Sequence, residues 1–295
     1  MQVTKNRFSR TANYRSIIHG VLVLAISLPL LSCNDGTNQD SDRGDDLRTI
    51  GILKFVRHPA LDDTEQGLMD RINSSELSDS LEIRFVRNVA DANAQRASSI
   101  AELMTINEVD VIVAIATPAA QAVANIPSEI PLVYGAVSAP EGAGIIPSER
   151  ATGIKNVGPS IVQSALAHIN QWFPKARTLG TIYNPSEQNS VYVQGILSSL
   201  ADSVLLELIQ LPVQQPSELP AAMESLSQRA DVIYSANDYT FNSAISAAVE
   251  ISIETGTPLI MGDISTLEAG STAAIGLAYY DMGSDVGDIV LRILG

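Results

Sequence analysis

The stretch Val109–Gln121, VDVIVAIATPAAQ, contains the junction between a predicted strand and a predicted helix that best indicates the fold. Its first eight residues are almost all apolar, and a continuous apolar run of this length is typical of a strand covered on both faces. Thr117 then suits the N-cap of a helix, and Pro118 suits its first position. The stretch therefore predicts a buried strand that runs directly into a helix, as in the repeating unit of a parallel sheet.

The same pattern recurs along the chain in both directions. Apolar runs that suit strands occupy Thr49–Phe55, Leu81–Val86, Val109–Ile115, Leu132–Tyr134, Thr178–Tyr183, Val204–Gln210, Asp231–Tyr234, Pro258–Met261 and Ala273–Ala278. Segments with helical spacing lie between them, at Leu61–Ile72, Ala92–Ile106, Pro118–Ala124, Ile161–Trp172, Val191–Leu200, Ser217–Gln228, Phe241–Glu254 and Met282–Leu294. This alternation predicts an α/β fold of parallel sheets joined by right-handed crossovers.

A long irregular segment divides these elements into two series. Residues 135–153, GAVSAPEGAGIIPSERATG, are rich in Gly, Pro and Ala, and a second β-α series begins near Ile154. A single sheet of nine strands is the alternative, but we expect two doubly wound lobes. Residues 49–154 with the returning helix 280–295 form the first, and residues 155–279 form the second. A ligand cleft then lies between the carboxyl ends of their strands.

The first 33 residues predict export. Four basic residues precede an apolar run, Ile17–Leu31, which Pro29 interrupts before the chain's single cysteine, Cys33. The run is too short and too interrupted to span a bilayer comfortably, so it favours a secretory signal. The sequence around Cys33 resembles a bacterial lipoprotein signal, in which the cysteine is lipidated and becomes the mature N-terminus. An ordinary signal peptide with a chance cysteine is the alternative.

Composition sets limits on the exported part. Residues 34–48 are polar and acidic, which favours a flexible tether over a packed segment. The chain has 18 basic and 33 acidic residues, and four of the basic ones belong to the predicted signal. So acidic a surface repels phosphate backbones, and we expect no nucleic-acid partner. A lone cysteine leaves no disulfide within the chain, so stability depends on the apolar core.

Polar residues collect where the predicted strands end. The amides of a helix start at Thr117, together with its hydroxyl, suit a carboxylate, although a simple cap is the plainer interpretation. Asn189 and Ser190 offer donors to a carboxylate, and Glu187 offers an acceptor to an amine. Asp238 is a candidate partner for an ammonium group. The remaining candidates at strand ends are Pro118, Ala119, Asn237, Asp263, His58 and Asp62. An equally good interpretation is that Asp62 or Asp63 simply caps the helix that starts there.

Four sequence blocks resemble a known family. HPALD at 58–62, VAIATPAAQA at 113–122, YNPSEQNS at 183–190 and AYYDMG at 278–283 are similar to substrate-binding lipoproteins of ABC importers, of the tryptophan- and tyrosine-type. The resemblance implies a type I periplasmic-binding-protein fold that closes over a small amino-acid-like ligand. It also implies a non-catalytic, membrane-anchored receptor in the periplasm or at the cell surface that delivers its ligand to a permease.

The resemblance also assigns residues to the pocket. It implies that Thr117, Pro118 and Ala119 line the first-lobe side. It implies that the second lobe supplies Glu187, Asn189, Ser190, Asn237, Asp238 and Asp263. Where relatives often have a Thr-Asp-Pro turn, this chain has Ser138-Ala139-Pro140, which removes one carboxylate near the cleft. Relatives also usually continue beyond the position of Gly295. Tyr239, Tyr134 and Tyr279 are candidates for an aromatic wall, and each also suits a core position.

Three other function classes are weighed against transport: an enzyme, a ligand sensor and a DNA-binding regulator. The chain has no HExxH, Walker lysine loop, GxSxG or cysteine nucleophile, and no nucleophile, base and orienting group can be assembled. We therefore expect no catalysis, and we expect neither a cofactor nor a metal. We also expect the protein to be a monomer. A ligand-sensing protein that feeds a signalling receptor needs the same clamp and remains the alternative. A lactose-repressor-like regulator is excluded because the predicted export signal occupies the place of a DNA-binding headpiece.

Overall fold

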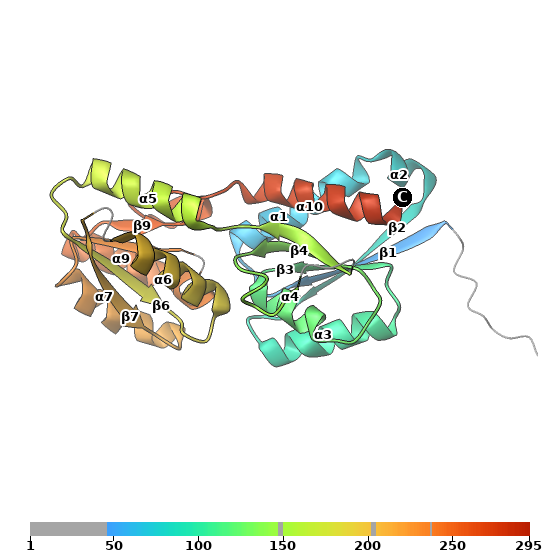
Figure 1. Cartoon of the computed structure of the whole chain (residues 1–295), viewed down its shortest axis with the longest axis horizontal. Helices are drawn as coiled ribbons and strands as arrows, with labels where there is room; N and C mark the ends of the chain where they lie inside the picture. The colour runs from blue at the N-terminus through green and yellow to red at the C-terminus, as the bar shows by residue number, and fades with distance from the viewer. Residues whose placement is uncertain (1–45, 147–149, 202–204, 237) are drawn as a thin grey trace, which may run out of the picture. The chain divides into compact units, whose positions relative to one another are not determined.

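Two parallel sheets form the framework of the protein (Figure 1). The computed structural model describes residues 46–146, 150–201, 205–236 and 238–295. The predicted signal, Cys33, Asn237 and nearly all of the predicted tether lie outside the described residues. The two sheets and their flanking helices confirm the predicted α/β class with two doubly wound lobes.

The first lobe contains a five-stranded sheet in the order β2-β1-β3-β4-β5. Its strands are β1 (Leu47–Lys54), β2 (Glu82–Val89), β3 (Val111–Ile115), β4 (Leu132–Val137) and β5 (Ala151–Lys155). Its helices are α1 (Pro59–Asn73), α2 (Glu76–Ser80), α3 (Ala94–Ile106), α4 (Thr117–Ala124) and α10 (Tyr279–Leu294). Every residue of β3 and β4 is buried, as expected for apolar strands covered on both faces.

The second lobe contains a five-stranded sheet in the order β7-β6-β8-β9-β10, which repeats the connectivity of the first. Its strands are β6 (Thr178–Tyr183), β7 (Glu207–Pro212), β8 (Val232–Ser235), β9 (Leu259–Met261) and β10 (Ala273–Ala274). Its helices are α5 (Pro159–Trp172), α6 (Gln188–Leu200), α7 (Leu219–Ser227), α8 (Tyr239–Ser243), α9 (Ile245–Thr255) and the 3-10 turns η2 (Pro216–Glu218) and η3 (Ile264–Leu267). All strand pairs are parallel.

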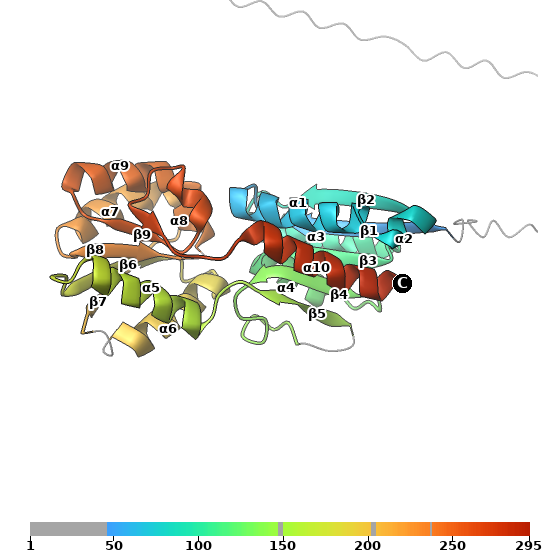
Figure 2. The ribbon, with the colours of Figure 1, turned by 90° about the horizontal axis from the view of Figure 1, so that it is seen from above.

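The helix α10 packs on the first lobe although it follows the second lobe in sequence. It lies alongside α1 in both views (Figures 1 and 2). Two glycines allow this approach: a Cβ on Gly67 would lie 2.0 Å from the Tyr280 carbonyl oxygen, and a Cβ on Gly283 would lie 2.1 Å from the Thr64 carbonyl oxygen. Because no side chain separates the helices there, α10 adds Met282, Val286 and Val290 to the first lobe's core.

The irregular segment after Tyr134 contains a strand that the sequence pattern did not predict. β5 pairs in parallel with β4, and the register shifts between Tyr134 and Val137. Its five residues, ATGIK, are largely polar or small and only Ala151 is fully buried. An edge strand of this composition lacks a continuous apolar run, so its residue pattern did not indicate a strand.

Smaller differences concern boundaries. The predicted helix Phe241–Glu254 is two helices, because Ala244 between α8 and α9 leaves the helical region, at φ −122° and ψ 23°. The predicted strand Val204–Gln210 is β7, which begins at Glu207. β10 has two residues where six were predicted, and the short helix α2 was not predicted.

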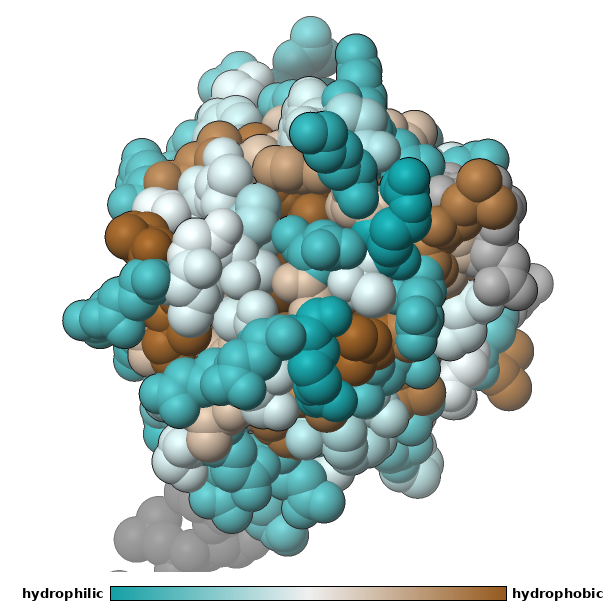
Figure 3. Space-filling view, turned by 90° about the vertical axis from the view of Figure 1, so that its left-hand side faces the viewer, coloured by the Kyte–Doolittle hydropathy of each residue, from teal (hydrophilic) through white to brown (hydrophobic). Residues whose placement is uncertain are grey.

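The exposed surface is polar with scattered apolar residues. Figure 3 shows the second-lobe end, where brown residues stand in separate groups among hydrophilic ones. The exposed apolar side chains of this lobe include Trp172, Leu205 and Ile253. Across the described parts of the chain, none of the helices combines the length and apolar character that crossing a membrane requires.

Candidate ligand-binding site

The strand order identifies one edge of each sheet as the place for a ligand. In open parallel sheets, ligands bind outside the carboxyl ends of strands where the connection direction reverses. That point lies between β1 and β3 in the first lobe and between β6 and β8 in the second. His58 follows β1, Thr117 follows β3, Glu187 follows β6 and Asp238 follows β8. Four predicted site residues therefore lie at the two reversal points.

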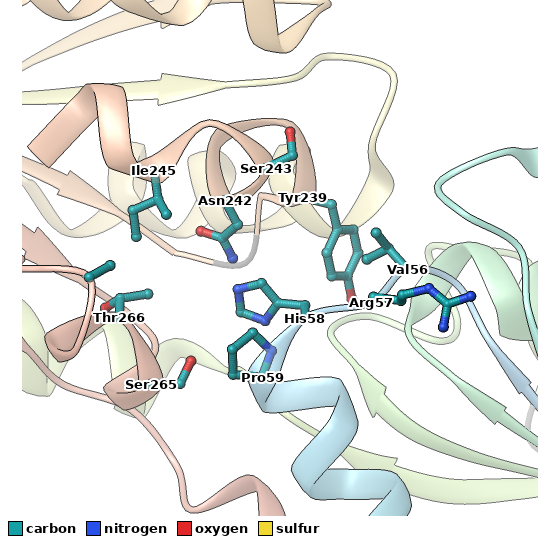
Figure 4. Close-up of a pocket in the computed structure, with 11 residues that line it drawn as sticks. Val56, Arg57, His58, Pro59, Tyr239, Asn242, Ser243, Ile245, Ser265 and Thr266 are labelled. Atoms are coloured by element: carbon teal, nitrogen blue, oxygen red, sulfur yellow. The ribbon is translucent and has the colours of Figure 1, made fainter.

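A cavity of about 270 Å³ lies where residues of the two lobes meet (Figure 4). The loop after β1 and the start of α1 form one side, and α8, the start of α9 and η3 form the other. In Figure 4 the His58 ring lies between Asn242 and Pro59, and the Tyr239 ring lies beside Val56. The lining residues are Val56, Arg57, His58, Pro59, Tyr239, Asn242, Ser243, Ile245, Ser265, Thr266 and Ala269.

A second cavity of about 380 Å³ shares Pro59 and Ser265 with the first. It extends toward the start of α10 and is lined by Pro59, Asp63, Asp263, Ile264, Ser265, Glu268, Ala278, Tyr279 and Tyr280. Three of these side chains are carboxylates, and none is cationic. The second cavity therefore favours a positively charged group, whereas the first offers mainly neutral and apolar walls.

Two side-chain contacts connect the lobes beside these cavities. His58 Nδ1 lies 3.6 Å from Asp263 Oδ2, with both side chains largely buried. The rings of Phe55 and Tyr239 have centroids 5.8 Å apart and are tilted by 56°. Tyr239 belongs to α8 in the second lobe but packs with the core of the first. The first-lobe loop after β1 thus reaches both a carboxylate and an aromatic ring of the second lobe.

Asp263 is the carboxylate that faces both His58 and the second cavity. Its Oδ1 accepts hydrogen bonds from the backbone N and the hydroxyl of Ser265, each at 2.9 Å, and so caps η3. Burial lowers the pKa of His58 below its usual value, against the raising effect of Asp263 and Asp62. His58 is therefore neutral at pH 7. Asp263 Oδ2 faces this neutral ring at a distance longer than a hydrogen bond.

Glu187 fastens the loop after β6 to the start of α8. Its carboxylate accepts hydrogen bonds from the backbone N of Tyr239 at 2.9 Å and from the backbone N and hydroxyl of Thr240 at 3.0 and 2.7 Å. Asn189 Nδ2 donates to the same carboxylate at 3.1 Å. Glu187, a residue of the second lobe, therefore holds the backbone of Tyr239 in place at the start of α8.

Asp238 makes a second internal connection between the same segments. It is the N-cap of α8, with Oδ1 accepting from the Phe241 backbone N at 2.6 Å. Its Oδ2 accepts from the Asn184 backbone N and the Ser190 hydroxyl, both at 2.6 Å. Burial first, and then the nearby Glu187, raise the pKa of Asp238 to about 6. Its carboxylate thus has three internal donors, and the side chain is 1% exposed.

A chain of buried polar groups connects the first lobe to α10. The Ser138 backbone N donates to Thr117 Oγ1 at 3.4 Å, and the Ser138 hydroxyl donates to Asn156 Oδ1 at 3.1 Å. Asn156 Nδ2 then donates to the Tyr279 hydroxyl at 3.5 Å. Thr117, Ser138 and Asn156 follow β3, β4 and β5, so three neighbouring strand ends share this chain.

The turn from β3 into α4 contains backbone strain. Ala116 has φ 88°, a region that residues with a Cβ rarely adopt. Such a conformation costs about 1–3 kcal/mol and is concentrated at functional sites. Ala116 is fully buried, so the surrounding lobe holds it there. The backbone strain therefore lies at the end of β3, where Thr117 was predicted to belong to the ligand-binding site.

Two predicted local roles are corrected by the structure. Thr117 is the first residue of α4, whose N-cap is Ala116, because the strained turn moves the helix start by one residue. Asp62 does not cap α1: the N-cap is His58, and no side chain bonds the cap. Asp62 instead pairs with Lys54, because that buried ammonium at the end of β1 requires anionic partners and also contacts Glu65.

The other predicted site residues fall into two groups. His58 and Asp263 line the cavities. Thr117, Pro118, Ala119, Ser138, Glu187, Asn189, Ser190 and Asp238 lie at or just after strand ends but line neither cavity. The helix α4 begins at Thr117, and α6 begins at Gln188, next to Glu187 and Asn189. These two helices are in contact across the lobes. Asn237 and Cys33 lie outside the described residues.

Several lining residues were not predicted from the sequence. Val56 and Pro59 flank His58 after β1, and Ser265 follows Asp263 after β9, so their positions at strand ends are signals that could have identified them. Asn242, Ser243 and Ile245 line the cavity because the helix breaks at Ala244. Nothing in the sequence pattern marked that break. Within the described residues, no group of three or more metal-ligating side chains is placed to hold a metal ion.

The fold and the cavities at its junction define the class of the protein. Two lobes with the same doubly wound strand order, joined where both sheets present their carboxyl ends, are the arrangement of type I periplasmic binding proteins. A family model described as ABC transporter substrate binding protein matches residues 49–295. The chain belongs to this family.

Individual relatives agree with this assignment. A tyrosine-binding protein of Clostridioides difficile is 29% identical over 285 residues, which cover 94% of this chain and 82% of the relative. The crystal structure of a conserved domain protein from Vibrio cholerae matches with a TM-score of 0.78 over 84% of each chain, and the two sequences are 30% identical. An ABC domain from Streptococcus pneumonia, solved in complex with L-Trp, is 23% identical with a TM-score of 0.77 over 84% of each chain and shares the fold.

Proposed function

We propose that this chain is the extracytoplasmic binding component of an ABC importer and that it captures an aromatic amino acid between its lobes. The observation that carries the proposal is the pair of cavities at the junction, where the Asp263 carboxylate and the Tyr239 ring lie beside His58. The tyrosine-binding relative and the neighbour in complex with L-Trp support this ligand class.

The ligand's ammonium group is assigned to Asp263. Asp238, which the sequence favoured, has three internal donors, and Glu187 has four. Among the residues that the structure describes, the ion-pair neighbour of Asp263 Oδ2 is the neutral His58 ring. A cation is therefore best accommodated at Asp263, where it compensates a buried negative charge.

The ligand's carboxylate is assigned to the first lobe. The start of α4 presents backbone amides, and the hydroxyls of Thr117 and Ser138 lie beside it. Helix starts favour anions because their amides are unpaired and the helix dipole is positive there. Pro118 and Ala119 then belong to the backbone that supplies these amides. Asn189 and Ser190 support the facing second-lobe loop through Glu187 and Asp238.

The ligand's ring is assigned to the aromatic side chains at the junction. Tyr239 stacks obliquely on Phe55 across the lobes, and Tyr279 lines the second cavity. Aromatic pairs of this kind contribute about 0.5–1.5 kcal/mol beyond their buried area. Tyr134 is 3% exposed and belongs to the first lobe's core, so it is left out of the pocket.

The cellular part of the proposal rests on the sequence. Lipidation of Cys33 after signal cleavage, with residues 34–48 as a tether, would hold a monomeric receptor at the membrane. There it would deliver ligand to a permease without catalysis or a cofactor. Replacement of Cys33 by alanine should release the protein from the membrane fraction, and mass spectrometry of the mature N-terminus should find a lipid on the wild-type cysteine.

Ligand binding is tested by thermal unfolding and calorimetry on the mature chain. L-tryptophan and L-tyrosine should raise the unfolding temperature, whereas sugars and nucleosides should not. A ligand at a hundred times its Kd adds about 2.7 kcal/mol to the stability of a one-site protein. The absence of a shift with every aromatic amino acid would refute the proposal.

The ammonium assignment has its own test with a matched control. Asp263→Asn should weaken binding by about 2–5 kcal/mol, because it removes a buried charge partner. Asp63 lines the same cavity but is exposed, so Asp63→Asn should leave the affinity nearly unchanged. Equal effects of the two substitutions, measured by calorimetry, would remove Asp263 from the site.

A further inference from the structure

The hydroxyl of Tyr234 is a buried polar group that has no hydrogen-bond partner in the described part of the chain. Tyr234 is the third residue of β8 and is 0% exposed. Its hydroxyl oxygen has no hydrogen-bond partner among the described residues. A buried hydroxyl without a partner destabilises a fold, and native proteins rarely keep one without a reason. The molecule therefore retains a polar group at a cost in stability.

This hydroxyl lies beside the groups that border the second cavity. A Cβ built on Gly262, the residue before Asp263, would be 3.3 Å from the Tyr234 hydroxyl. Tyr234 and Asp263 both act electrostatically on Tyr279 and contribute to the raised pKa of its hydroxyl. Asp263 and Tyr279 themselves line the cavity. Asp263 and Tyr279 therefore line the second cavity, and the Tyr234 hydroxyl, which lines neither cavity, lies beside Gly262, the residue that precedes Asp263.

This set of acceptors matches a primary ammonium group, which carries three N–H donors. On the basis of the proposed function, we propose that Tyr234 is a specificity-determining residue whose hydroxyl, with Asp263 and Tyr279, completes a three-acceptor site for the ligand's primary ammonium. Asp263 supplies the charge, and the two phenols accept the remaining N–H groups. N-methylation replaces one donor with a methyl group and leaves one acceptor unpaired, so the site should reject N-methyl amino acids.

The test combines one substitution with one change in the ligand. In the wild type, N-methyl-L-tryptophan should bind at least about tenfold more weakly than L-tryptophan. Tyr234→Phe should weaken L-tryptophan binding by about tenfold to a hundredfold and reduce the penalty for N-methylation. The same substitution should leave the unfolding temperature of the ligand-free protein unchanged or higher, because the removed hydroxyl had no partner.

Ser227 provides the matched control. It carries another buried hydroxyl without a partner among the described residues, but it lies at the end of α7, at the opposite end of the strands from Asp263. Ser227→Ala should leave both affinities unchanged. Equal binding of L-tryptophan by the wild type and Tyr234→Phe would overturn the inference and indicate that Tyr234 holds only a buried water. Equal wild-type affinity for L-tryptophan and its N-methyl form would also overturn it.

These outcomes are distinct from a failure of the proposed function. If the wild type binds neither L-tryptophan nor L-tyrosine, the aromatic ligand class is wrong, and the ammonium site is refuted with it. If the wild type binds one of them and Tyr234→Phe binds it equally well, only the role of Tyr234 is refuted. Calorimetry on the mature chain measures both cases.

Discussion

At the residue scale, a buried carboxylate, Asp238, and a half-buried one, Glu187, lie close together at the start of α8. Glu187 and Asp238 each accept several backbone hydrogen bonds, and together they hold the loop after β6 against the helix. Such a pair is costly, because burial and like charge both oppose ionisation. The raised pKa of Asp238 records this cost. We therefore interpret the pair as positioning groups that fix Tyr239 before a ligand arrives.

The raised pKa predicts how Asp238 affects stability as a function of pH. Its folded pKa is about 6 and its ordinary value is 3.8, so the native state keeps a proton that the unfolded state releases between these values. The contribution of Asp238 to the free energy of unfolding should therefore fall as pH rises from about 4 to 6, by about 2–3 kcal/mol in total. Urea unfolding of the wild type and Asp238→Asn over pH 4–7 measures the difference.

Asp231 serves as a control of opposite sign. Backbone N–H donors of Arg177 and Thr178 lower its pKa, so its contribution is present at neutral pH and is lost as pH falls below its ordinary value of 3.8. Asp231→Asn should therefore leave the difference from wild type constant between pH 5 and 7. A difference for Asp238→Asn that is also constant from pH 4 to 7 would contradict the buried-carboxylate interpretation.

Residue roles were predicted less well from the sequence than residue positions. Most of the candidate residues do lie at or just after strand ends, because the carboxyl ends of parallel strands meet at one edge whatever the side chains are. The partners of Asp62 and Asp238 were not predictable from sequence spacing. Lys54 lies on a different element from Asp62, at the end of β1, and Asn184 is distant in sequence from Asp238 and donates through its backbone N. Whether a carboxylate is free for a ligand depends on such contacts, which sequence spacing does not report.

At the element scale, the contact between α1 and α10 fixes the last helix on the first lobe. Gly283→Ala would place a Cβ against the Thr64 carbonyl, and a backbone atom cannot move aside as a side chain can. We expect the substitution to lower the free energy of unfolding by about 3 kcal/mol. Chemical denaturation measures the change.

Gly195 provides a control for the intrinsic effect of glycine in a helix. It is exposed on α6, and a Cβ there would meet nothing within 4 Å. Gly195→Ala should therefore raise stability by about 1 kcal/mol, because alanine is the better helix former. If Gly283→Ala were also stabilising, the helices would not be in close contact at this point.

The strands that are buried on both faces were all predicted, and so were the less buried edge strands β2 and β7. β3, β4, β6 and β8 have continuous apolar runs, and each was predicted within a few residues. The missed edge strand β5 has only one fully buried residue, so the composition carried little information. The break between α8 and α9 was missed because Ala244 is a good helix former; Tyr239 and Phe241, which precede it, are buried in the cores of different lobes.

At the scale of the whole molecule, His58 and Asp263 relate lobe closure to pH. In this structure burial keeps the pKa of His58 below its ordinary value of 6.5. Separation of the lobes would return the ring to water and restore that value. The open form therefore binds a proton more readily than the closed form. The contribution of His58 to closure is complete above pH 6.5 and is lost as pH falls below this value.

Ligand affinity should follow the same dependence, since binding requires closure. The Kd for L-tryptophan should rise as pH is lowered from 7.5 to 5.5, and His58→Gln should reduce this rise. Asp238 does not contribute, because its partners Asn184, Ser190 and Phe241 all belong to the second lobe and stay with it on opening. His168→Gln is the matched control, because His168 is half-buried on α5 and its ring nitrogen contacts the Ser164 carbonyl within its own helix. Calorimetry across this range separates the variants, and an unchanged pH dependence in His58→Gln would show that closure does not bury this ring.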